Sequence, residues 1–446
     1  MVPISAASPV AFASPLPKAC DVVVIGAGII GIMTAWYLAR RGLKVVVCEK
    51  GRVAGEQSSR NWGWVRQQGR DPAELPIMIE ANRIWQGLES EAGEDMGFRR
   101  TGVLYMANSA SDMAAFEAWM VHADAHQVDT VLLSTAETSA MVPGAAMTWH
   151  GGLWTGSDGR AEPWLAVPAL ARAASRSGVA IAEACAVRTL DIAAGRVAGV
   201  VTEQGRIACD QVVLAGGAWS ALFARLHGVD LPQLSVLSTV VATAPMAEIF
   251  SGNAADARLA FRRRQDGGYT LALGDWHERP IGPDSFRHFA KFYPHLIKDG
   301  LSVRYLPAAP RHFPDGWRTP RRWPAEAPSP FEAMRVLDPR PSPFALRQIQ
   351  KRFAECFPGL GRPPITTAWA GMIDSMPDVV PVVDYAAGLP GLFIATGMSG
   401  HGFGIGPAIG RIVADLLAGK PAGHDMSRFR FSRFSDGSPI RQGTAL

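Results

Sequence analysis

The feature that most restricts the fold of this chain is a glycine-rich turn close to its start. Gly26, Gly28 and Gly31 in VVVIGAGIIG form the pattern G-x-G-x-x-G. Apolar runs before and after this turn predict a strand, the turn, a helix and a second strand over residues 21–49. Such a β-α-β unit implies a parallel sheet.

The glycine spacing suits a nucleotide because each position solves a steric problem. Gly26 permits the tight turn, Gly28 lets a pyrophosphate approach the backbone, and Gly31 lets the helix pack closely on the strand. The first helical residues, Ile29 and Ile30, offer unpaired N–H groups at the positive end of the helix dipole. We therefore expect the phosphates of a dinucleotide at this turn.

A carboxylate at the end of the second strand narrows the kind of nucleotide. Glu49 follows Gly31 by 18 residues, where it can hold both ribose hydroxyls but would repel a 2′-phosphate. An adenine dinucleotide other than NADP is therefore expected. The alternative interpretation is a glycine turn without a ligand.

A second glycine-rich turn favours FAD over NAD. Residues 397–404 read GMSGHGFG and lie between a short apolar strand, 391–396, and a helix predicted at about 405–418. A dinucleotide needs one helix start for its pyrophosphate. A second helix start suits a flavin ring, because its amides could stabilise the negative charge that develops at N1 and the C2 carbonyl on reduction.

The remaining segments predict an α/β fold: a Rossmann-like FAD-binding domain with a mostly antiparallel α+β substrate domain. Residues 206–215 predict a further strand of the parallel sheet, whereas short strands near 102–107, 236–243 and 269–273 predict an antiparallel sheet. The predicted parts are FAD-binding segments 20–97, 159–235 and 361–446, and substrate segments 98–158 and 236–360.

Composition excludes several classes of protein. A net charge of +4 and 19% charged residues do not favour a nucleic-acid partner. Five widely spaced cysteines predict neither a disulfide framework nor a zinc site, and no metal site is expected. Glycines interrupt the uncharged run 22–39, so we interpret it as a buried strand and helix, not a membrane span.

The first 20 residues carry one charged side chain, Lys18, and make a poor secretory signal. We expect them to form a loose arm and the protein to be cytoplasmic, with a peripheral location at the inner membrane left open. Residues 307–343 contain ten prolines and several arginines. This proline-rich module is interpreted either as an irregular surface segment or as a docking face for a membrane or an electron acceptor.

Several ordered motifs between about Asp21 and Phe431 make the chain resemble the D-amino-acid-oxidase superfamily of flavoproteins. The fold that this resemblance implies is the D-amino-acid-oxidase, or glutathione-reductase-2-like, fold. SGHGFG at 399–404 resembles the sarcosine and dimethylglycine oxidase branch. The motifs that are closer to the bacterial L-amino acid deaminases are GEQSSR at 55–60, CAVR at 185–188, QVVLAGGAWS at 211–220 and RRWPAEAPSPFEAMRV at 321–336.

The resemblance implies a noncovalent FAD site. Glu49 and Lys50 would hold the adenosine ribose, and Val187 would meet the adenine. Sarcosine oxidases attach flavin through a cysteine at a place that corresponds to about Gly371, and this chain has none there. The implied cofactor residues are Gly26, Gly28, Ile29, Ile30, Gly31, Glu49, Lys50, Gln57, Ser58, Ser59, Gly63, Trp64, Val187, Gly216, Gly217, Trp219, Gly397, Met398, Ser399, Gly400, His401 and Gly402.

The residue that would bind the substrate carboxylate is less settled. The arginine that the deaminases use aligns with Gly274, so that anchor is missing here. Arg66 falls where sarcosine oxidases keep a carboxylate-binding arginine, and its planar fork suits the task. A surface arginine is the alternative interpretation. Arg262 or Arg264, which alternation places on one face of a strand, is a reserve anchor.

Other residues near the expected flavin have two interpretations. Trp62 and Trp64 could wall the substrate pocket or pack in the core. His401 could act as a catalytic base, but its ring could equally pack beside the flavin while the backbone of its turn does the binding.

The expected reaction is oxidation of the amine of a small amino acid. Hydride would pass from Cα to flavin N5, and the imine would hydrolyse to a keto acid and ammonia. Either oxygen or a membrane electron acceptor would complete the cycle, so the enzyme could be an oxidase or a dehydrogenase. The alternatives are a D-amino acid or N-methyl amine as substrate, and a flavin-bearing subunit of a larger complex. The oligomeric state is left open.

Overall fold

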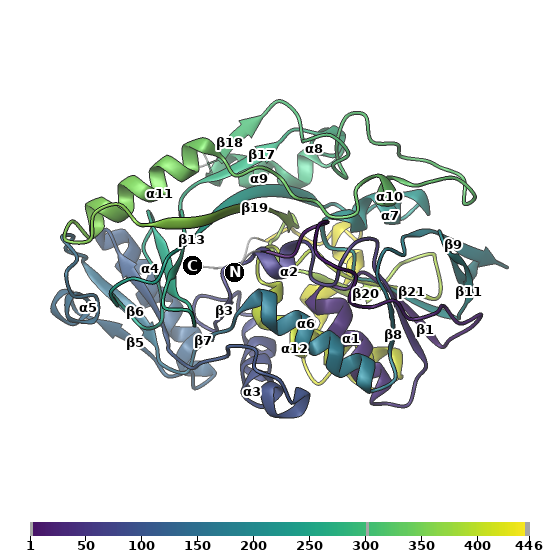
Figure 1. Ribbon diagram of the computed structural model, residues 1–446, viewed down its shortest axis with the longest axis horizontal. Helices are drawn as coiled ribbons and strands as arrows, with labels where there is room; N and C mark the ends of the chain where they lie inside the picture. Colours follow the sequence, from purple (N-terminus) through teal and green to yellow (C-terminus); the bar gives the residue numbers. More distant parts are fainter. Residues whose placement is uncertain (1–2, 300–302, 442–446) are drawn as a thin grey trace.

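A computed structural model of the protein describes residues 3–299 and 303–441. Two large sheets dominate the described chain, one of six strands and one of ten (Figure 1). Helices cover the six-stranded sheet, and the larger sheet arches beside it. The architecture is the expected α/β fold with a second, mostly antiparallel sheet.

The six-stranded sheet is built around the first strand of the glycine motif. Strand β1 (Val22–Ile25) pairs in parallel with β2 (Val45–Cys48) on one side and with β12 (Gln211–Leu214) on the other. Strands β8 (Ala180–Ala182) and β21 (Leu392–Thr396) extend the sheet in parallel, and β20 (Val382–Tyr385) is an antiparallel edge. Apolar side chains bury both faces, as the run of valines in β1 and β2 predicts.

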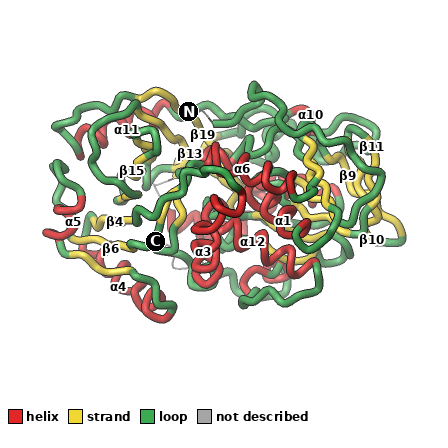
Figure 2. The backbone as a smooth tube through the Cα atoms, turned by 60° about the horizontal axis from the view of Figure 1, so that its bottom comes forward, coloured by secondary structure: helices red, strands yellow, loops and turns green. Residues whose placement is uncertain are grey.

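Two helices from opposite ends of the chain pack on one face of this sheet. They are α1 (Ile29–Ala39) and α12 (Gly402–Leu417), which lie side by side in both views (Figure 2). Their backbones approach closely because a Cβ at Gly410 would lie 2.5 Å from Cβ of Met33. A Cβ at Gly406 would meet the side chain of Ile29 at 2.9 Å.

The ten-stranded sheet has the order β18-β17-β13-β16-β15-β14-β4-β6-β5, with β19 paired along the whole length of β13. Most neighbours are antiparallel; β14 with β4 and β17 with β18 are parallel. Its strands are β4 (Val103–Ala107), β5 (Thr130–Leu133), β6 (Gly151–Thr155), β13 (Leu234–Thr243), β14 (Asn253–Ala255), β15 (Ala260–Arg263), β16 (Tyr269–Ala272), β17 (His277–Pro280), β18 (Val303–Leu306) and β19 (Ile365–Ser375).

The remaining elements connect and cover the two sheets. Two small sheets contain β3 (Trp64–Val65) with β7 (Gly159–Arg160), and β9 (Val187–Ala193), β10 (Arg196–Thr202) and β11 (Gly205–Ala208). The other helices are α2 (Gln57–Arg60), α3 (Leu75–Ala92), α4 (Ala110–Ala125), α5 (Thr135–Met141), α6 (Pro163–Arg176), α7 (Ser220–Leu226), α8 (Pro283–Arg287), α9 (Phe289–Asp299), α10 (Pro330–Ala333) and α11 (Pro343–Cys356), with short 3₁₀ turns at Gly217–Trp219, Ser427–Phe429 and Phe431–Phe434. Within the described residues, no helix has the length and apolarity that crossing a bilayer requires.

Two strand predictions differ from the structure. The single strand predicted at 206–215 is two strands in different sheets, because β11 pairs with β10 and only β12 joins β1. Strand β19 belongs to the larger sheet, although it falls inside the segment 361–446 that we assigned to FAD binding. The domain boundaries themselves stay a prediction, and residues 442–446 of the last segment lie outside the described residues.

The N-terminal arm is tied down instead of loose. Glu183 accepts hydrogen bonds from the backbone N–H groups of Ala11 (2.6 Å) and Phe12 (3.1 Å), and Ala13 forms a bridge with Ala182. The buried side chain of Phe12 and the hydrogen bonds to Glu183 hold the arm against β8. Residues 1–2 lie outside the described part of the chain.

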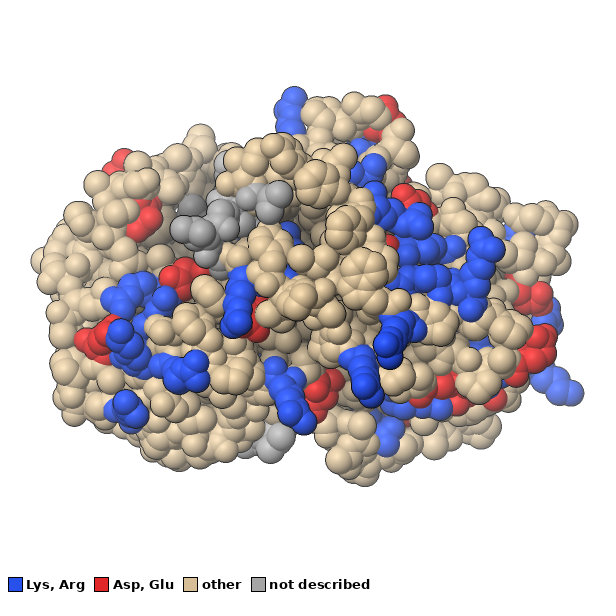
Figure 3. All heavy atoms as spheres, turned by 90° about the horizontal axis from the view of Figure 1, so that it is seen from above, with Lys and Arg blue, Asp and Glu red and all other residues tan. Residues whose placement is uncertain are grey.

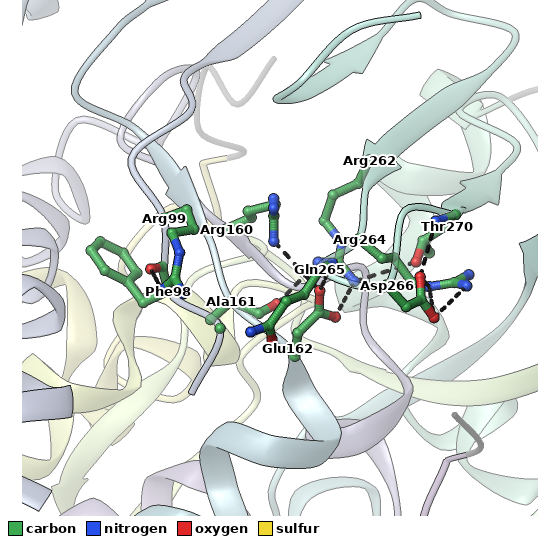
Figure 4. Close-up of polar contacts among 12 residues, drawn as sticks. Phe98, Arg99, Arg160, Ala161, Glu162, Arg262, Arg264, Gln265, Asp266 and Thr270 are labelled. Carbon is green, nitrogen blue, oxygen red and sulfur yellow. Dashed lines mark hydrogen bonds and ion pairs between the residues drawn. The ribbon is translucent and has the colours of Figure 1, made fainter. Parts of the chain in front are cut away.

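A buried ion pair joins the two halves of the molecule (Figure 4). Glu162, just before α6, accepts a hydrogen bond from Nη2 of Arg262 in β15 at 2.9 Å, and both side chains are 1% exposed. Arg160 lies 3.4 Å from the same carboxylate. Burial and the neighbouring Arg262 lower the pKa of Arg160 to about 10, and Glu162 only partly offsets this.

This geometry corrects the reserve prediction that Arg262 or Arg264 binds substrate. Arg264 donates to the carboxylate of Asp266 at 2.8 Å and to the carbonyl oxygen of Thr243 at 2.8 Å. Arg262 lies in β15 and Arg264 directly follows it, and both side chains meet acceptors of the protein itself. Both guanidinium groups have structural partners, so neither serves as the anchor.

Removing the carboxylate of Glu162 should strongly destabilise the fold, because it leaves Arg262 as a buried charge without its partner. Glu162→Gln should lower the free energy of unfolding by about 3–5 kcal/mol in urea melts. The control is Glu355→Gln, which breaks an ion pair to Arg258 whose side chains are 42% and 40% exposed. That variant should lose less than about 1 kcal/mol. Equal losses in the two variants would contradict this role.

Candidate active site

A single cavity of about 700 Å³ runs from the six-stranded sheet to the larger one, and both glycine turns line it. This volume is in the range of ligand sites. Most of the predicted cofactor and substrate residues line it. They are Gly26, Gly28, Ile29, Ile30, Glu49, Lys50, Gln57, Ser58, Trp62, Trp64, Arg66, Val187, Gly216, Gly217, Trp219, Met398, Ser399, Gly400, His401 and Gly402.

The first glycine turn leaves room for an anion at the start of α1. Gly26 has φ +104°, and a Cβ at Gly31 would lie 2.0 Å from the carbonyl oxygen of Gly26, so both positions require glycine. No side chain caps the helix at Gly28. Ser58 accepts a hydrogen bond from the N–H of Ile29 at 3.0 Å, which leaves the next amides available to phosphate oxygens.

The carboxylate of Glu49 is fixed at the end of β2. It accepts hydrogen bonds from the N–H groups of Ala27 (2.8 Å) and Gly51 (2.7 Å). Burial raises its pKa, against the effect of these hydrogen bonds and of Lys50. An acidic group held here beside Val187 and Trp219 fits the ribose and adenine of a dinucleotide.

The second glycine turn points another helix start into the same cavity. Gly397, Ser399 and Gly400 have φ values of +77°, +50° and +86°. Gly397 donates its N–H to the buried carboxylate of Asp374 at 2.9 Å, which fixes the turn. No side chain caps α12 at His401, so its first amides are free for a ligand. The residues present therefore fit a flavin adenine dinucleotide, with the start of α1 at its pyrophosphate and the start of α12 at its flavin ring.

The ring of His401 is held by a buried carboxylate. Nδ1 of His401 lies 2.9 Å from Oε2 of Glu74, whose side chain is fully buried. Burial lowers the pKa of His401 although Glu74 opposes this, so the ring is mostly neutral at pH 7. Burial would raise the pKa of Glu74, but His401 and Arg70 outweigh it and lower that pKa.

Two arginines stand together on the cavity wall. Arg66 donates from Nη1 to the carbonyl oxygen of Gln68, and its guanidinium lies 5.5 Å from the ring centroid of Tyr105. Arg70 is buried; its Nη1 makes no hydrogen bond to a described residue and lies 3.6 Å from Glu74. Burial and the neighbouring Arg66 lower the pKa of Arg70 to about 10, so it stays charged at neutral pH.

The loop that carries these arginines is fixed by a buried carboxylate. Asp158 accepts hydrogen bonds from the backbone N–H groups of Gln67 (2.7 Å) and Gln68 (3.2 Å). Burial raises the pKa of Asp158 to about 6, so it is ionised at pH 7 and can hold the loop. The position of Arg66 is therefore restricted by the fixed backbone that directly follows it.

Aromatic rings line the cavity beside Arg66. The rings of Trp62 and Trp64 meet edge to face at 5.5 Å, and Trp64 lies 6.2 Å from Tyr105. Phe116 continues this row at 6.3 Å from Tyr105. All four rings line the cavity, so this part of its wall is rich in aromatic side chains.

Some predicted cofactor residues have protein partners or lie behind the cavity wall. Lys50 lines the cavity, but its ammonium group is 2.6 Å from Glu56 and also donates to backbone carbonyls of the proline-rich module. Ser59 accepts from the N–H of Ile4 at 3.3 Å. Gly31, Gly63 and Gly397 support turns behind the lining, because a Cβ at each would meet protein atoms within 2.4 Å.

Sequence reasoning missed several lining residues. Arg70 lines the cavity, and Glu74 behind it lies 3.6 Å from its Nη1. Both lie in the non-helical stretch before α3, so no periodic pattern indicates them. Tyr105 and Phe116 come from β4 and α4, and Phe331 from the proline-rich module. Only the tertiary structure brings these three rings to the cavity.

Comparison with known proteins gives consistent matches. The family model described as FAD dependent oxidoreductase (DAO) matches residues 21–416. Human mitochondrial sarcosine dehydrogenase is 30% identical over 276 residues, which cover 60% of this chain but 30% of that protein. The sarcosine oxidase subunit beta of Rhodobacter capsulatus is 24% identical over 452 residues, covering 98% of this chain and 94% of that protein. The structure of L-amino acid deaminase from Proteus myxofaciens in complex with anthranilate superimposes with a TM-score of 0.91, at 30% identity, over 98% of this chain and all of that one.

Proposed function

This chain belongs to the DAO family of FAD-dependent oxidoreductases, and from that premise we propose that it oxidises the amine of an amino acid with an apolar side chain. Bound FAD would supply the two-electron oxidation of the carbon–nitrogen bond, and water would hydrolyse the resulting imine to a keto acid and ammonia. The cofactor is proposed to be noncovalent, because β19 has no cysteine near Gly371 and Cys356 is buried in α11.

The observation that carries this proposal is the pair Arg66 and Arg70 beside the aromatic rings of the cavity wall. A buried guanidinium nitrogen without a hydrogen-bond acceptor costs free energy unless a ligand completes it. A substrate carboxylate would do so, and a planar guanidinium can grip it with two parallel hydrogen bonds. Arg66, which is only partly buried, is the proposed anchor, and Arg70 adds positive charge behind it.

The protein's own residues would orient the substrate. With the carboxylate on Arg66, the side chain would lie against Trp62, Trp64 and Tyr105, which favour apolar and aromatic groups. Fixing both ends restricts the direction in which the α-hydrogen points. Neutral His401, held through Nδ1 by Glu74, presents its other ring nitrogen for a hydrogen bond and is not assigned a base role.

The proposal is tested by supplying the purified protein with paired L and D enantiomers of leucine and phenylalanine and with N-methylglycine. Peroxide formation and dye reduction are measured separately, which also distinguishes an oxidase from a dehydrogenase. We expect turnover of the L enantiomers with apolar side chains. Turnover of none of these compounds would contradict amine oxidation.

Two further candidate functions rest on specific observations. A sarcosine-like secondary amine is favoured by the match to human sarcosine dehydrogenase and by an arginine at position 66. A role as one subunit of a larger complex is favoured by the match along nearly the whole chain to a protein that is itself a subunit. Turnover of N-methylglycine supports the first, and turnover by the purified chain alone contradicts the second.

The arginine assignment predicts a kinetic effect. Arg66→Ala should raise KM strongly while FAD stays bound, because the substrate carboxylate loses a charged hydrogen-bond partner. The loss of about 2–5 kcal/mol corresponds to about 30-fold to several thousand-fold in kcat/KM. The control is Arg196→Ala in β10, whose side chain is exposed and lies outside the cavity lining. An unchanged KM in Arg66→Ala would mean that another residue is the anchor.

The electron acceptor is proposed to be oxygen or a membrane component. A membrane component would be reached through an exposed apolar face of the protein. Phe286, Phe289, Tyr293, Ile297 and Trp317 on α8, α9 and the proline-rich module are 49–66% exposed. Phe289, Tyr293 and Ile297 follow one another at intervals of four residues along α9, so they share one side of the helix. Figure 3 views the molecule from this side, where lysine and arginine side chains gather. Aromatic and apolar side chains can enter the interfacial region of a bilayer, and nearby cationic side chains attract anionic lipid headgroups, so this face suits an anionic membrane.

Membrane contact predicts that the protein sediments with vesicles containing phosphatidylglycerol. Ile297→Glu should lower the bound fraction several-fold, since it places a negative charge on the apolar side of α9. Val121→Glu on α4 is the matched control, because Val121 is also exposed (62%) but lies on another helix. A wild-type protein that stays in the supernatant would contradict membrane contact.

A further inference from the structure

The proline-rich module does not lie apart from the cofactor cavity. Its segment 321–337, which includes α10, packs beside α7 and β9 (Figure 1). The rings of Phe331 in α10 and Phe223 in α7 lie 6.0 Å apart, and Trp323 donates its indole N–H to the carbonyl oxygen of Arg188 at 2.9 Å. This segment therefore covers the part of the FAD-binding domain where Glu49 and Val187 line the cavity.

Lys50 is the centre of this contact. Its ammonium donates to the carbonyl oxygens of Met334 (2.8 Å) and Arg335 (3.0 Å) and to Glu56 (2.6 Å). Glu56 in turn accepts from the N–H of Leu337 at 3.0 Å. The side chain of Lys50, the residue directly after Glu49, thus binds the backbone of the module.

Two ion pairs also join the same segment to the FAD-binding domain. Arg188 of β9 lies 2.7 Å from Glu332, and Nη2 of Arg335 lies 2.5 Å from Glu203. Arg335 also donates from Nη1 to the carbonyl oxygen of Lys50 at 3.0 Å. These pairs are partly buried, so they contribute more than ordinary surface pairs.

The module also supplies an apolar wall to the cavity. Phe331 lines the cavity and is only 5% exposed. Its ring meets the ring of Trp219 edge to face at 5.7 Å, and Trp219 donates its indole N–H to Glu56 at 3.0 Å. Lys50, Glu56, Trp219 and Phe331 therefore form one connected cluster at this end of the cavity.

We propose that segment 321–337 is part of the cofactor site: it closes the adenosine end, with Phe331 as a wall, so that FAD binding and docking of the module stabilise each other. The proposal rests on the noncovalent FAD proposed above. A ligand that contacts a docked segment binds that docked state more tightly, and by thermodynamic linkage the docked segment raises the affinity for the ligand.

The test uses the full-length protein from which FAD has been removed. The dissociation constant of FAD is measured by quenching of flavin fluorescence in wild type, Arg335→Ala and Phe331→Ala. We expect each variant to raise it by about tenfold, a usual size for such coupling. Arg322→Ala is the matched control, because Arg322 is an exposed arginine of the same module. It should change the dissociation constant by less than about twofold.

A second measurement needs no variant. Trypsin cleaves wild-type protein after exposed arginines of the module such as Arg318 and Arg322, and the rate is compared with and without saturating FAD. We expect FAD to slow this cleavage several-fold. A dissociation constant of Arg335→Ala within twofold of wild type, or equal cleavage rates with and without FAD, would overturn the inference. A wild-type protein that binds no FAD would instead overturn the proposed function, and the inference with it.

Discussion

The close contact between α1 and α12 is the constraint on which the site depends. Glycines at 406 and 410 let the backbone of α12 approach Ile29 and Met33, where any side chain would force the helices apart. Because the helices run together from their first turns, their N-termini meet at one cavity. A larger separation would move one set of free amides away from the other, and the two glycine turns could no longer serve one ligand.

The charged groups of the molecule divide into two kinds according to their partners. Arg262, Arg264 and Arg433 are buried and each meets a carboxylate within 2.9 Å. Arg70 is equally buried, but its nearest carboxylate oxygen, on Glu74, is 3.6 Å from Nη1. Desolvation is costly for all of these groups, and Arg262 also has a buried Nε without a hydrogen-bond partner among the described residues. Of these four arginines only Arg70 lines the cavity, so its unpaired nitrogen is the one that a ligand there can complete. This criterion separates the candidate site from the structural ion pairs.

The elements that the sequence predicts well are those whose pattern is local. The β-α-β unit follows from glycine spacing and apolar runs, and the turn before α12 follows from its glycines, although that helix begins at Gly402 and not at about 405. Arg66 lines the cavity, as the resemblance implies, and its role as the carboxylate anchor stays a prediction. Local patterns do not reveal partners: alternation offers Arg262 and Arg264 as reserve substrate anchors, whereas the structure pairs them with Glu162 and Asp266.

Other features depend on contacts between distant segments and could not be predicted. The role of Lys50 is set by carbonyl groups of residues 334 and 335, and the place of Phe331 is set by Trp219. The chain between residues 206 and 215 has one apolar pattern, yet it divides between two sheets, because β11 pairs with β10 and β12 pairs with β1. In each case a tertiary partner, and not a local preference, decides the structure.

The central claim is that one noncovalently held FAD lies across both helix starts. The most direct measurement is the absorbance spectrum of the purified protein before and after acid precipitation, with the flavin in the supernatant identified and counted per chain. The account predicts a yellow protein that releases about one FAD per chain into the supernatant. A colourless protein that takes up no added FAD, or flavin that stays with the precipitate, would contradict it.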